Sequence, residues 1–159
     1  DGTALYELDG VTIRVTNLLG SAFINEEVNA PYLAMLDVLA DEEPANIHIV
    51  DLHAEATGEK QCLAYELDGK VSAVLGTHTH VQTNDAMVYN NTCYITDLGM
   101  CGPKDSVIGD DKEAIIDRFK TGIYCPANIA KCNTYIINGA IIDLGKENKI
   151  ETFNLEVKA

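Results

Sequence analysis

Three of the four histidines follow short apolar stretches, at positions where strands are expected to end. His53 follows the apolar run 46–52, and His78 and His80 follow the run 71–75. Ligand sites of open α/β sheets form at the carboxyl ends of strands, so two strands would bring these three imidazoles to one sheet edge. Neutral imidazole is a common ligand of transition metals, and the arrangement therefore suits a metal site.

The spacing of His78 and His80 predicts that both rings lie on one side of an extended segment, because side chains alternate along a strand. The small residues Gly76 and Thr77 before the pair leave room for a close backbone approach. A lone His-x-His also occurs as ordinary surface chemistry, and spacing alone leaves both interpretations open. His48 lies inside the first apolar run, out of phase with the histidine that follows that run, and is interpreted as a core or partner-contact residue.

The elements that must position these histidines alternate between strands and helices. Buried strands are predicted over 46–52 and 71–75, with a helix over 57–67 between them, and this order indicates a crossover between parallel or near-neighbour strands. Thr57 is the expected cap of that helix. The other expected elements are a hairpin of 5–8 and 11–18 around Asp9-Gly10, and a helix from Pro31 to about residue 41.

The second half of the chain is predicted to add strands and one more helix. A capping box of Asp110 and Glu113 predicts a helix to about residue 120. Short strands are expected over 86–89 and 93–96, and a long antiparallel hairpin over 134–144 and 149–157, with its turn near Lys146-Glu147-Asn148. The fold class that follows is α/β (α+β) with mixed strands.

The charge of the chain restricts its ligands. The 159 residues carry a formal net charge of -14 and give a pI of about 4.4. An acidic surface repels the phosphate backbone of nucleic acids, so broad nucleic-acid binding is not expected. A small phosphate ester is still compatible, because bound metal ions supply positive charge locally. No run of 18 apolar residues is present, and no membrane span is predicted.

The cysteines and the first residues bear on the compartment and on processing. The count of five cysteines is odd and includes no Cys-x-x-Cys pair, which disfavours a disulfide framework or a zinc ribbon. Scattered reduced thiols are typical of a cytosolic protein, so a cytoplasmic location is predicted. The chain opens with Asp1-Gly2-Thr3, so we expect either a processed chain or a fragment.

The segments around the three histidines resemble motifs of the calcineurin-like metallophosphoesterases, in the form of the YmdB-type branch. Residues 76–83 (GTHTHVQT) resemble the Gly-His-x-His motif, and residues 51–57 (DLHAEAT) resemble the single-His motif before it. Residues 94–103 and 115–121 also resemble that branch. The resemblance runs from about residue 1 to the final hairpin, and it implies the C-terminal part of a β-sandwich flanked by helices.

Three motifs of the family are missing from this sequence: an N-terminal Asp motif, a Gly-Glu-Asn motif and a Gly-Asn-His motif. In the family they hold the remaining metal ligands, the bridging carboxylate and a histidine thought to act as proton donor. The resemblance therefore implies that residues 1–159 are one incomplete domain and contain no catalytic proton donor. Cys101 stands in a loop where the family leads us to expect a small polar residue.

The resemblance also implies a ligand set for two divalent metal ions, of iron, manganese or zinc. His53 and His78 would bind one ion and His80 the other. Asp51 and Glu55 are candidates for orienting the imidazole N–H groups, but solvation of a strand end and a loop is the simpler explanation of the two.

Two further residues are candidates for the pocket that the resemblance implies. Thr77 stands directly before the histidine pair. Asp97, with Gly99 and Gly102, either lines that pocket or forms a tight turn. The sequence does not decide between these two interpretations.

The function implied by the resemblance is hydrolysis of small phosphodiesters, such as 2′,3′-cyclic nucleotides, by a metal-dependent enzyme. The isolated chain is expected to be inactive, and its expected partner is the missing N-terminal segment of the same protein. The apolar sheet surface that this segment would cover leads us to expect a homo-oligomer. The alternatives are a folded fragment with a residual metal site and a regulatory or scaffold module of the same fold.

Overall fold

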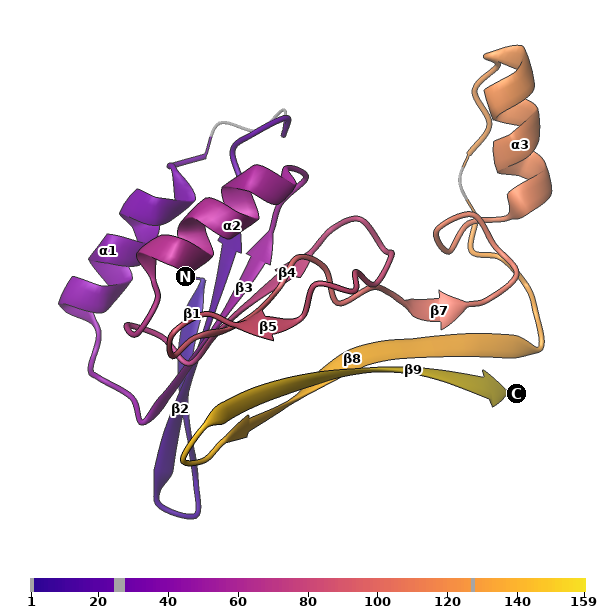
Figure 1. Ribbon diagram of the computed structural model, residues 1–159. Helices are drawn as coiled ribbons and strands as arrows, with labels where there is room; N and C mark the ends of the chain where they lie inside the picture. Colours follow the sequence, from indigo (N-terminus) through magenta and orange to yellow (C-terminus); the bar gives the residue numbers. More distant parts are fainter. Residues whose placement is uncertain (1, 25–27, 127) are drawn as a thin grey trace.

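The computed structural model describes residues 2–24, 28–126 and 128–159, which form two sheets and three helices (Figure 1). The larger sheet has the strand order β1-β2-β3-β4-β6-β5 and the smaller one the order β7-β8-β9. The elements of the larger sheet and its helices are β1 (Thr3–Leu8), β2 (Val11–Leu19), α1 (Pro31–Asp41), β3 (Ile47–His53), α2 (Thr57–Glu66), β4 (Ala73–Thr77), β5 (Met87–Val88) and β6 (Cys93–Ile95). The remaining elements are β7 (Cys101–Pro103), α3 (Lys112–Thr121), β8 (Thr134–Leu144) and β9 (Asn148–Lys158).

The centre of the larger sheet is parallel. Strands β2, β3, β4 and β6 pair in parallel, while β1 and β5 pair antiparallel at the two edges. Helices α1 and α2 lie together on one face of this sheet (Figure 1). The predicted crossover is confirmed, since α2 connects β3 to its parallel neighbour β4.

The main core lies between the two helices and the parallel strands. Burial alternates along β3, where His48, Val50 and Leu52 are buried and the residues between them are half-buried. The strand is therefore fully covered on one face only, and not on both faces as its apolar sequence predicts. The core cluster also includes Leu18, Met35, Ala54, Leu63, Ala64, Leu67, Val71, Val74 and Tyr94.

Helix α2 begins one residue earlier than predicted, because the residue expected to cap it is already helical. Ala56 occupies the N-cap position without a side-chain hydrogen bond, and Thr57 is the first helical residue. Glu59 contributes a different contact, because its carboxylate accepts hydrogen bonds from the backbone N–H and the hydroxyl of Ser21, at 2.8 and 2.9 Å. The start of α2 is thus fixed by a contact with the loop that follows β2.

Helix α3, in contrast, begins one residue after the predicted position. Its N-cap is Asp111, whose carboxylate accepts a hydrogen bond from the Ala114 N–H at 3.0 Å, and not Asp110. The backbone of Asp110 is paired with Val107 in both directions and forms a bridge with Ile129. This pairing holds Asp110 outside the helix.

The smaller sheet is built on the predicted hairpin. Strands β8 and β9 pair along their full length, from Thr134 opposite Lys158 to Leu144 opposite Asn148. Residues 101–103, expected in a loop, form the short strand β7 against β8, with Cys101 opposite Ile137. Strand β9 lies against β5 and β6 of the larger sheet, which brings the two sheets together.

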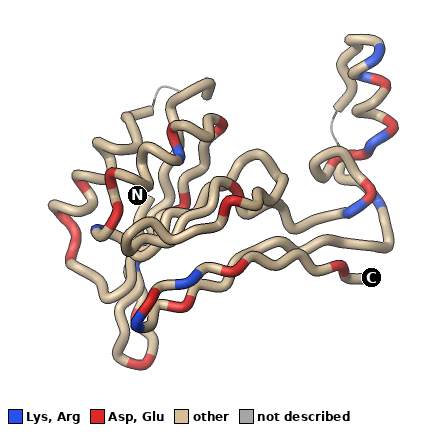
Figure 2. Tube along the Cα trace, in the orientation of Figure 1, with Lys and Arg blue, Asp and Glu red and all other residues tan. Residues whose placement is uncertain are grey.

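The charges follow the expectation of an acidic surface. Asp and Glu are spread along the whole trace, whereas Lys and Arg are few (Figure 2). No disulfide links the cysteines within the described ranges. The three helices seen here are all too short, or too polar, to cross a bilayer.

Candidate metal centre

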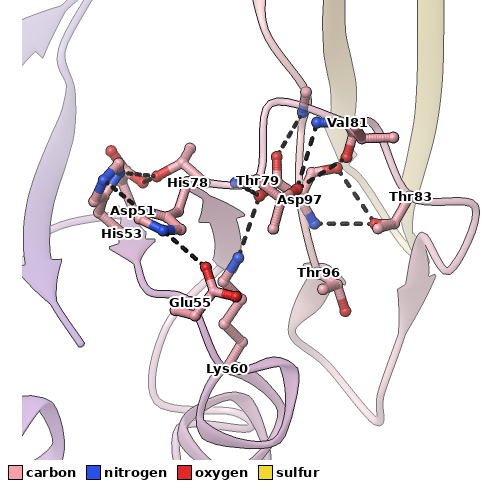
Figure 3. Close-up of polar contacts among 12 residues, drawn as sticks. Asp51, His53, Glu55, Lys60, His78, Thr79, Val81, Thr83, Thr96 and Asp97 are labelled. Carbon is pink, nitrogen blue, oxygen red and sulfur yellow. Dashed lines mark hydrogen bonds and ion pairs between the residues drawn. The ribbon is translucent and has the colours of Figure 1, made fainter. Parts of the chain in front are cut away.

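The carboxyl ends of β3 and β4 carry a connected set of polar side chains (Figure 3). His53 lies opposite Thr77 in the parallel register, and Asp51 is two residues before His53 on the same face of β3. The Thr77 hydroxyl donates a hydrogen bond to Asp51 Oδ1 at 2.8 Å and lies 3.1 Å from His53 Nδ1. The strand register therefore produces this cluster directly.

His78 continues the cluster beyond the end of β4. Its Nδ1 atom lies 3.1 Å from His53 Nε2, and the two rings meet edge to face with 4.9 Å between their centroids. Its Nε2 atom lies 2.9 Å from Glu55 Oε2. A continuous chain of contacts thus leads from Asp51 to Glu55 through both imidazoles.

The protons of this chain can be assigned from its contacts. Thr77 gives its only proton to Asp51, so His53 Nδ1 must donate to Thr77, and a neutral His53 then has a lone pair at Nε2. If His78 Nδ1 donates to that lone pair, a neutral His78 has no proton left for Glu55. With both imidazoles neutral, the cluster therefore has one proton too few to make all of these contacts hydrogen bonds.

A metal ion between the two imidazoles removes the shortage. Both nitrogens of the 3.1 Å pair would then present lone pairs, while His53 Nδ1–H donates to Thr77 and His78 Nε2–H donates to Glu55. Two nitrogens about 2.0–2.1 Å from one ion stand about 2.8–3.4 Å apart at tetrahedral or octahedral angles. The spacing and the proton count of His53 and His78 both fit a shared metal ion.

Two nitrogens are only part of a coordination shell. Across residues 2–24, 28–126 and 128–159, no group of three or more His, Cys, Asp or Glu side chains is placed to hold a metal ion. The described chain thus supplies donors without closing a site by itself.

His80 lies apart from this pair. The backbone φ angles of His78 and His80 are 118° and 67°, so the segment turns and is not the extended His-x-His that the spacing predicts. His80 Nδ1 donates to the Ile108 carbonyl at 2.7 Å, which leaves the Nε2 lone pair of a neutral ring available. His80 borders a cavity of about 680 Å³ whose other lining residues are Met100, Cys101, Gly102, Pro103, Ile108, Gly109, Asp110, Ile129, Tyr135, Ile136 and Ile137.

Asp97 lies beneath the turn that carries the histidines and does not line the cavity. Its Oδ2 atom accepts a hydrogen bond from the Thr79 N–H at 2.8 Å, and Oδ1 accepts one from the Gly99 N–H at 2.9 Å. The side chain of Asp97 is 1% exposed and forms an ion pair with Lys60 at 3.2 Å. This placement corresponds to the tight-turn interpretation of Asp97.

Lys60 is a residue of this region that sequence reasoning missed. A lysine in a helix is ordinarily exposed, yet the side chain of Lys60 is 1% exposed. The spacing contains the signal that identifies it. Lys60 lies on the same helical stripe as the buried residues Leu63, Ala64 and Leu67, at positions i, i+3, i+4 and i+7.

The sequence matches the family described as YmdB-like protein over residues 1–154. It is 39% identical over 150 residues to a 2′,3′-cyclic-nucleotide 2′-phosphodiesterase of Bacillus subtilis, covering 93% of this chain and 56% of that protein. It is 37% identical over 153 residues to a putative phosphatase/phosphodiesterase of Mycoplasma genitalium, covering 94% of this chain and 54% of the relative. The chain therefore spans about half the length of these curated relatives.

Two solved structures have the same fold. A novel phosphatase from Mycoplasma pneumoniae superposes with a TM-score of 0.88 at 34% identity, over 99% of this chain and 58% of its own. A hypothetical protein from Thermus thermophilus gives a TM-score of 0.87 at 35% identity, over 98% of this chain and 62% of its own. The mixed fold of strands and helices is thus shared with a phosphatase.

Proposed function

Because the chain belongs to the YmdB-like family, we propose that it carries part of the active site of a metal-dependent phosphodiesterase acting on small phosphodiesters such as 2′,3′-cyclic nucleotides. The names of its relatives support a phosphoesterase as the broader class. The observation that carries the proposal is the 3.1 Å separation of His53 Nε2 and His78 Nδ1, in a cluster whose contacts are satisfied when both nitrogens face a cation.

Each residue of the cluster has a role in this proposal. His53 and His78 bind one divalent ion, and His80, through Nε2, binds the second. Asp51 acts through the Thr77 hydroxyl to keep the Nδ1 proton on His53, and Glu55 keeps the Nε2 proton on His78. Such hydrogen bonds orient the rings and raise their basicity as ligands.

Two bound ions of iron, manganese or zinc would supply the charge that attracts a phosphodiester to this acidic chain and lower the pKa of a bound water. The donors described here do not complete either coordination shell. We propose that the remaining ligands and the proton donor come from a preceding segment of the same domain, since this chain covers only 56% and 54% of the two relatives.

The incomplete donor set also favours a second candidate for residues 1–159 alone, namely a metal-binding module without turnover. Such a module has His53 and His78 in place but lacks the bridging carboxylate and the proton donor. The two candidates predict the same folded structure and differ in metal content and hydrolysis.

The test is metal content and hydrolysis of bis-p-nitrophenyl phosphate, measured on residues 1–159 and on the natural full-length protein. In the full-length protein, His78→Ala/His80→Ala should remove bound metal and reduce turnover by more than the roughly 10–100-fold that losing a hydrogen-bond partner of a ligand costs. His48→Gln, a histidine that contacts Thr16 away from the cluster, is the matched control. Unchanged metal and turnover in the double variant would refute the assignment. Metal without turnover in residues 1–159 would identify the non-catalytic module.

A further inference from the structure

We propose that Lys60 is a positioning residue, which fixes the turn carrying His78 and His80 by way of Asp97. This inference rests on the proposed function in one respect only, namely that the two histidines bind metal. Lys60 is on α2 and contacts neither imidazole in the structure; its Nζ atom lies 3.2 Å from Asp97 Oδ2. The same oxygen accepts the hydrogen bond from the N–H of Thr79, the residue between the two histidines.

The turn requires such an anchor because its backbone is unfavourable. Residues His78 and His80 both have positive φ angles, 118° and 67°, a region that residues other than glycine seldom adopt. Conformations of this kind persist where surrounding contacts determine them. The backbone is held on either side, by Leu98 N–H to the Gly76 carbonyl at 2.9 Å and Met100 N–H to the His80 carbonyl at 3.1 Å. The Asp97 carboxylate supplies the contact in the middle, at Thr79.

The stem of Lys60 passes close to Gly76, where a side chain would collide chiefly with the backbone of Thr96. A Cβ atom on Gly76 would lie 2.9 Å from Lys60 Cδ and 1.7 Å from the Thr96 carbonyl oxygen. The stem of the lysine therefore passes beside the end of β4, directly before the histidine turn. Gly76, which directly precedes Thr77 and the histidine pair, is explained by this close approach.

A purely stabilising role for the ion pair is the competing explanation. Both side chains are 1% exposed, so the desolvation of two charges opposes their attraction, and apolar residues of similar size often replace such pairs without loss. The two explanations differ in what a neutral pair would change. A positioning pair controls the histidine turn, whereas a stabilising pair affects only the free energy of unfolding.

The experiment compares Lys60→Met and Lys60→Met/Asp97→Asn with wild type in the natural full-length protein. The double variant carries no buried unpaired charge, so it separates positioning from a failure to fold. Lys70→Met, the same substitution at an exposed lysine just beyond α2, is the control. The readouts are the imidazole nitrogen NMR signals of the metal-free protein, amide exchange at Thr79, and affinity for Mn²⁺ and Zn²⁺ by titration calorimetry.

In the double variant we expect the signals of His78 and His80 to shift, and the Thr79 amide to exchange at least about tenfold faster. The signal of His48 reports on the core and should not move, because His48 is on β3 and its ring contacts Thr16. Metal affinity should also fall, by at most the roughly 10–100-fold that losing a direct hydrogen-bond partner of a ligand costs, because the turn that carries the two rings is held less firmly. Unchanged His78, His80 and Thr79 signals, with a lower melting temperature alone, would show that the pair is only stabilising.

The outcomes also separate this inference from the proposed function. A wild-type protein that binds neither metal would refute the proposed metal centre, while the metal-free NMR data would still decide whether Lys60 positions the turn. If both variants fail to fold, the exchange rate of the Thr79 amide in the wild-type protein still tests the inference. A Thr79 amide that exchanges as fast as an exposed loop amide would exclude the Asp97 contact and overturn the inference.

Discussion

The two sheets of this molecule differ in how their residues are covered. In the larger sheet, α2 buries Lys60, Leu63 and Ala64 against the strands, and Leu52 of β3 is 0% exposed. Helix α3 has no buried residue, and Leu155 of β9 in the smaller sheet is 54% exposed. The well-packed sheet is the one whose strands β3 and β4 lead into His53 and His78. Strands β7 and β8, which line the cavity beside His80, belong to the sheet that is less covered.

Gln82 is among the side chains that connect the two regions. The Gln82 amide nitrogen lies 3.2 Å from the carbonyl oxygens of Leu98 and Gly139 and 3.1 Å from that of Phe153. Gln82 follows the histidine turn closely, and Gly139 and Phe153 lie opposite each other in β8 and β9. The smaller sheet is thus attached to the segment that carries the candidate ligands.

The comparison is tested most strongly by removing one leucine from each sheet. Leu52→Ala should lower the free energy of unfolding by about 2–5 kcal/mol, because it leaves a cavity in the core. Leu155→Ala should change it by no more than about 0.5 kcal/mol, as is usual for surface positions. Urea denaturation of residues 1–159 measures both. An equal loss at Leu155 would contradict the comparison and support the expected homo-oligomer, with another copy covering β9.

A pair of glycines tests how tightly the larger sheet is packed near the site. Gly76→Ala would place a Cβ atom 1.7 Å from the Thr96 carbonyl oxygen, so the backbone must move, and we expect a loss of about 3 kcal/mol. Gly58→Ala in α2 meets nothing within 4 Å and should stabilise the helix by up to about 1 kcal/mol. Thermal unfolding of the two variants and of wild type measures both changes in stability. A tolerated alanine at position 76 would show that the end of β4 is loosely packed.

Helix α3 should respond to substitution without affecting the rest of the molecule. Asp111→Ala removes the N-cap acceptor, which should weaken the helix by about 1 kcal/mol and speed amide exchange in its first turns about fivefold. Asp117→Ala, at an exposed position within the helix, is the matched control. The global free energy of unfolding should stay unchanged in both, because α3 buries nothing. A global loss in Asp111→Ala would mean that α3 is coupled to the sheet.

The smallest expected effect is a pH dependence from His48. Burial, and then the positive charge of Arg14, lower the pKa of His48 below its ordinary 6.5. The unfolded chain therefore binds a proton that the folded chain resists, and stability should fall as the pH drops below about 6.5, with no effect above it. One group contributes at most about 1.4 kcal/mol per pH unit. Urea denaturation between pH 7.5 and 5 should show a shallower slope for His48→Gln than for wild type. Identical slopes would exclude His48 as the source.

Much of the fold and part of the site follow from local sequence. The rule that parallel strands end at one sheet edge predicts the meeting of His53 and His78, and the structure confirms this proximity. The apolar runs, the Pro31 start of α1 and the final hairpin are likewise confirmed. These features depend on periodicity and turn chemistry, which short segments contain.

The features that the sequence did not predict depend on distant contacts. His78 and His80 turn into positive φ because Thr79 is held by Asp97, 18 residues further along the chain. The helical spacing indicates the burial of Lys60, but no local pattern identifies its partner, the same carboxylate. The separation of His80 from the other two rings follows from its bond to Ile108, on another loop.

The strand order of the larger sheet has a consequence for synthesis. Strands β1, β2, β3 and β4 occupy neighbouring positions in the order in which they leave the ribosome, and β6 then pairs with the free side of β4. Strand β5 is the exception, since its one partner in this sheet, β6, is made after it; even so, no strand has to be inserted between two that are already paired. Chains that emerge from the ribosome gradually can therefore build this sheet by addition alone, with the histidine turn completed only after the strands that support it.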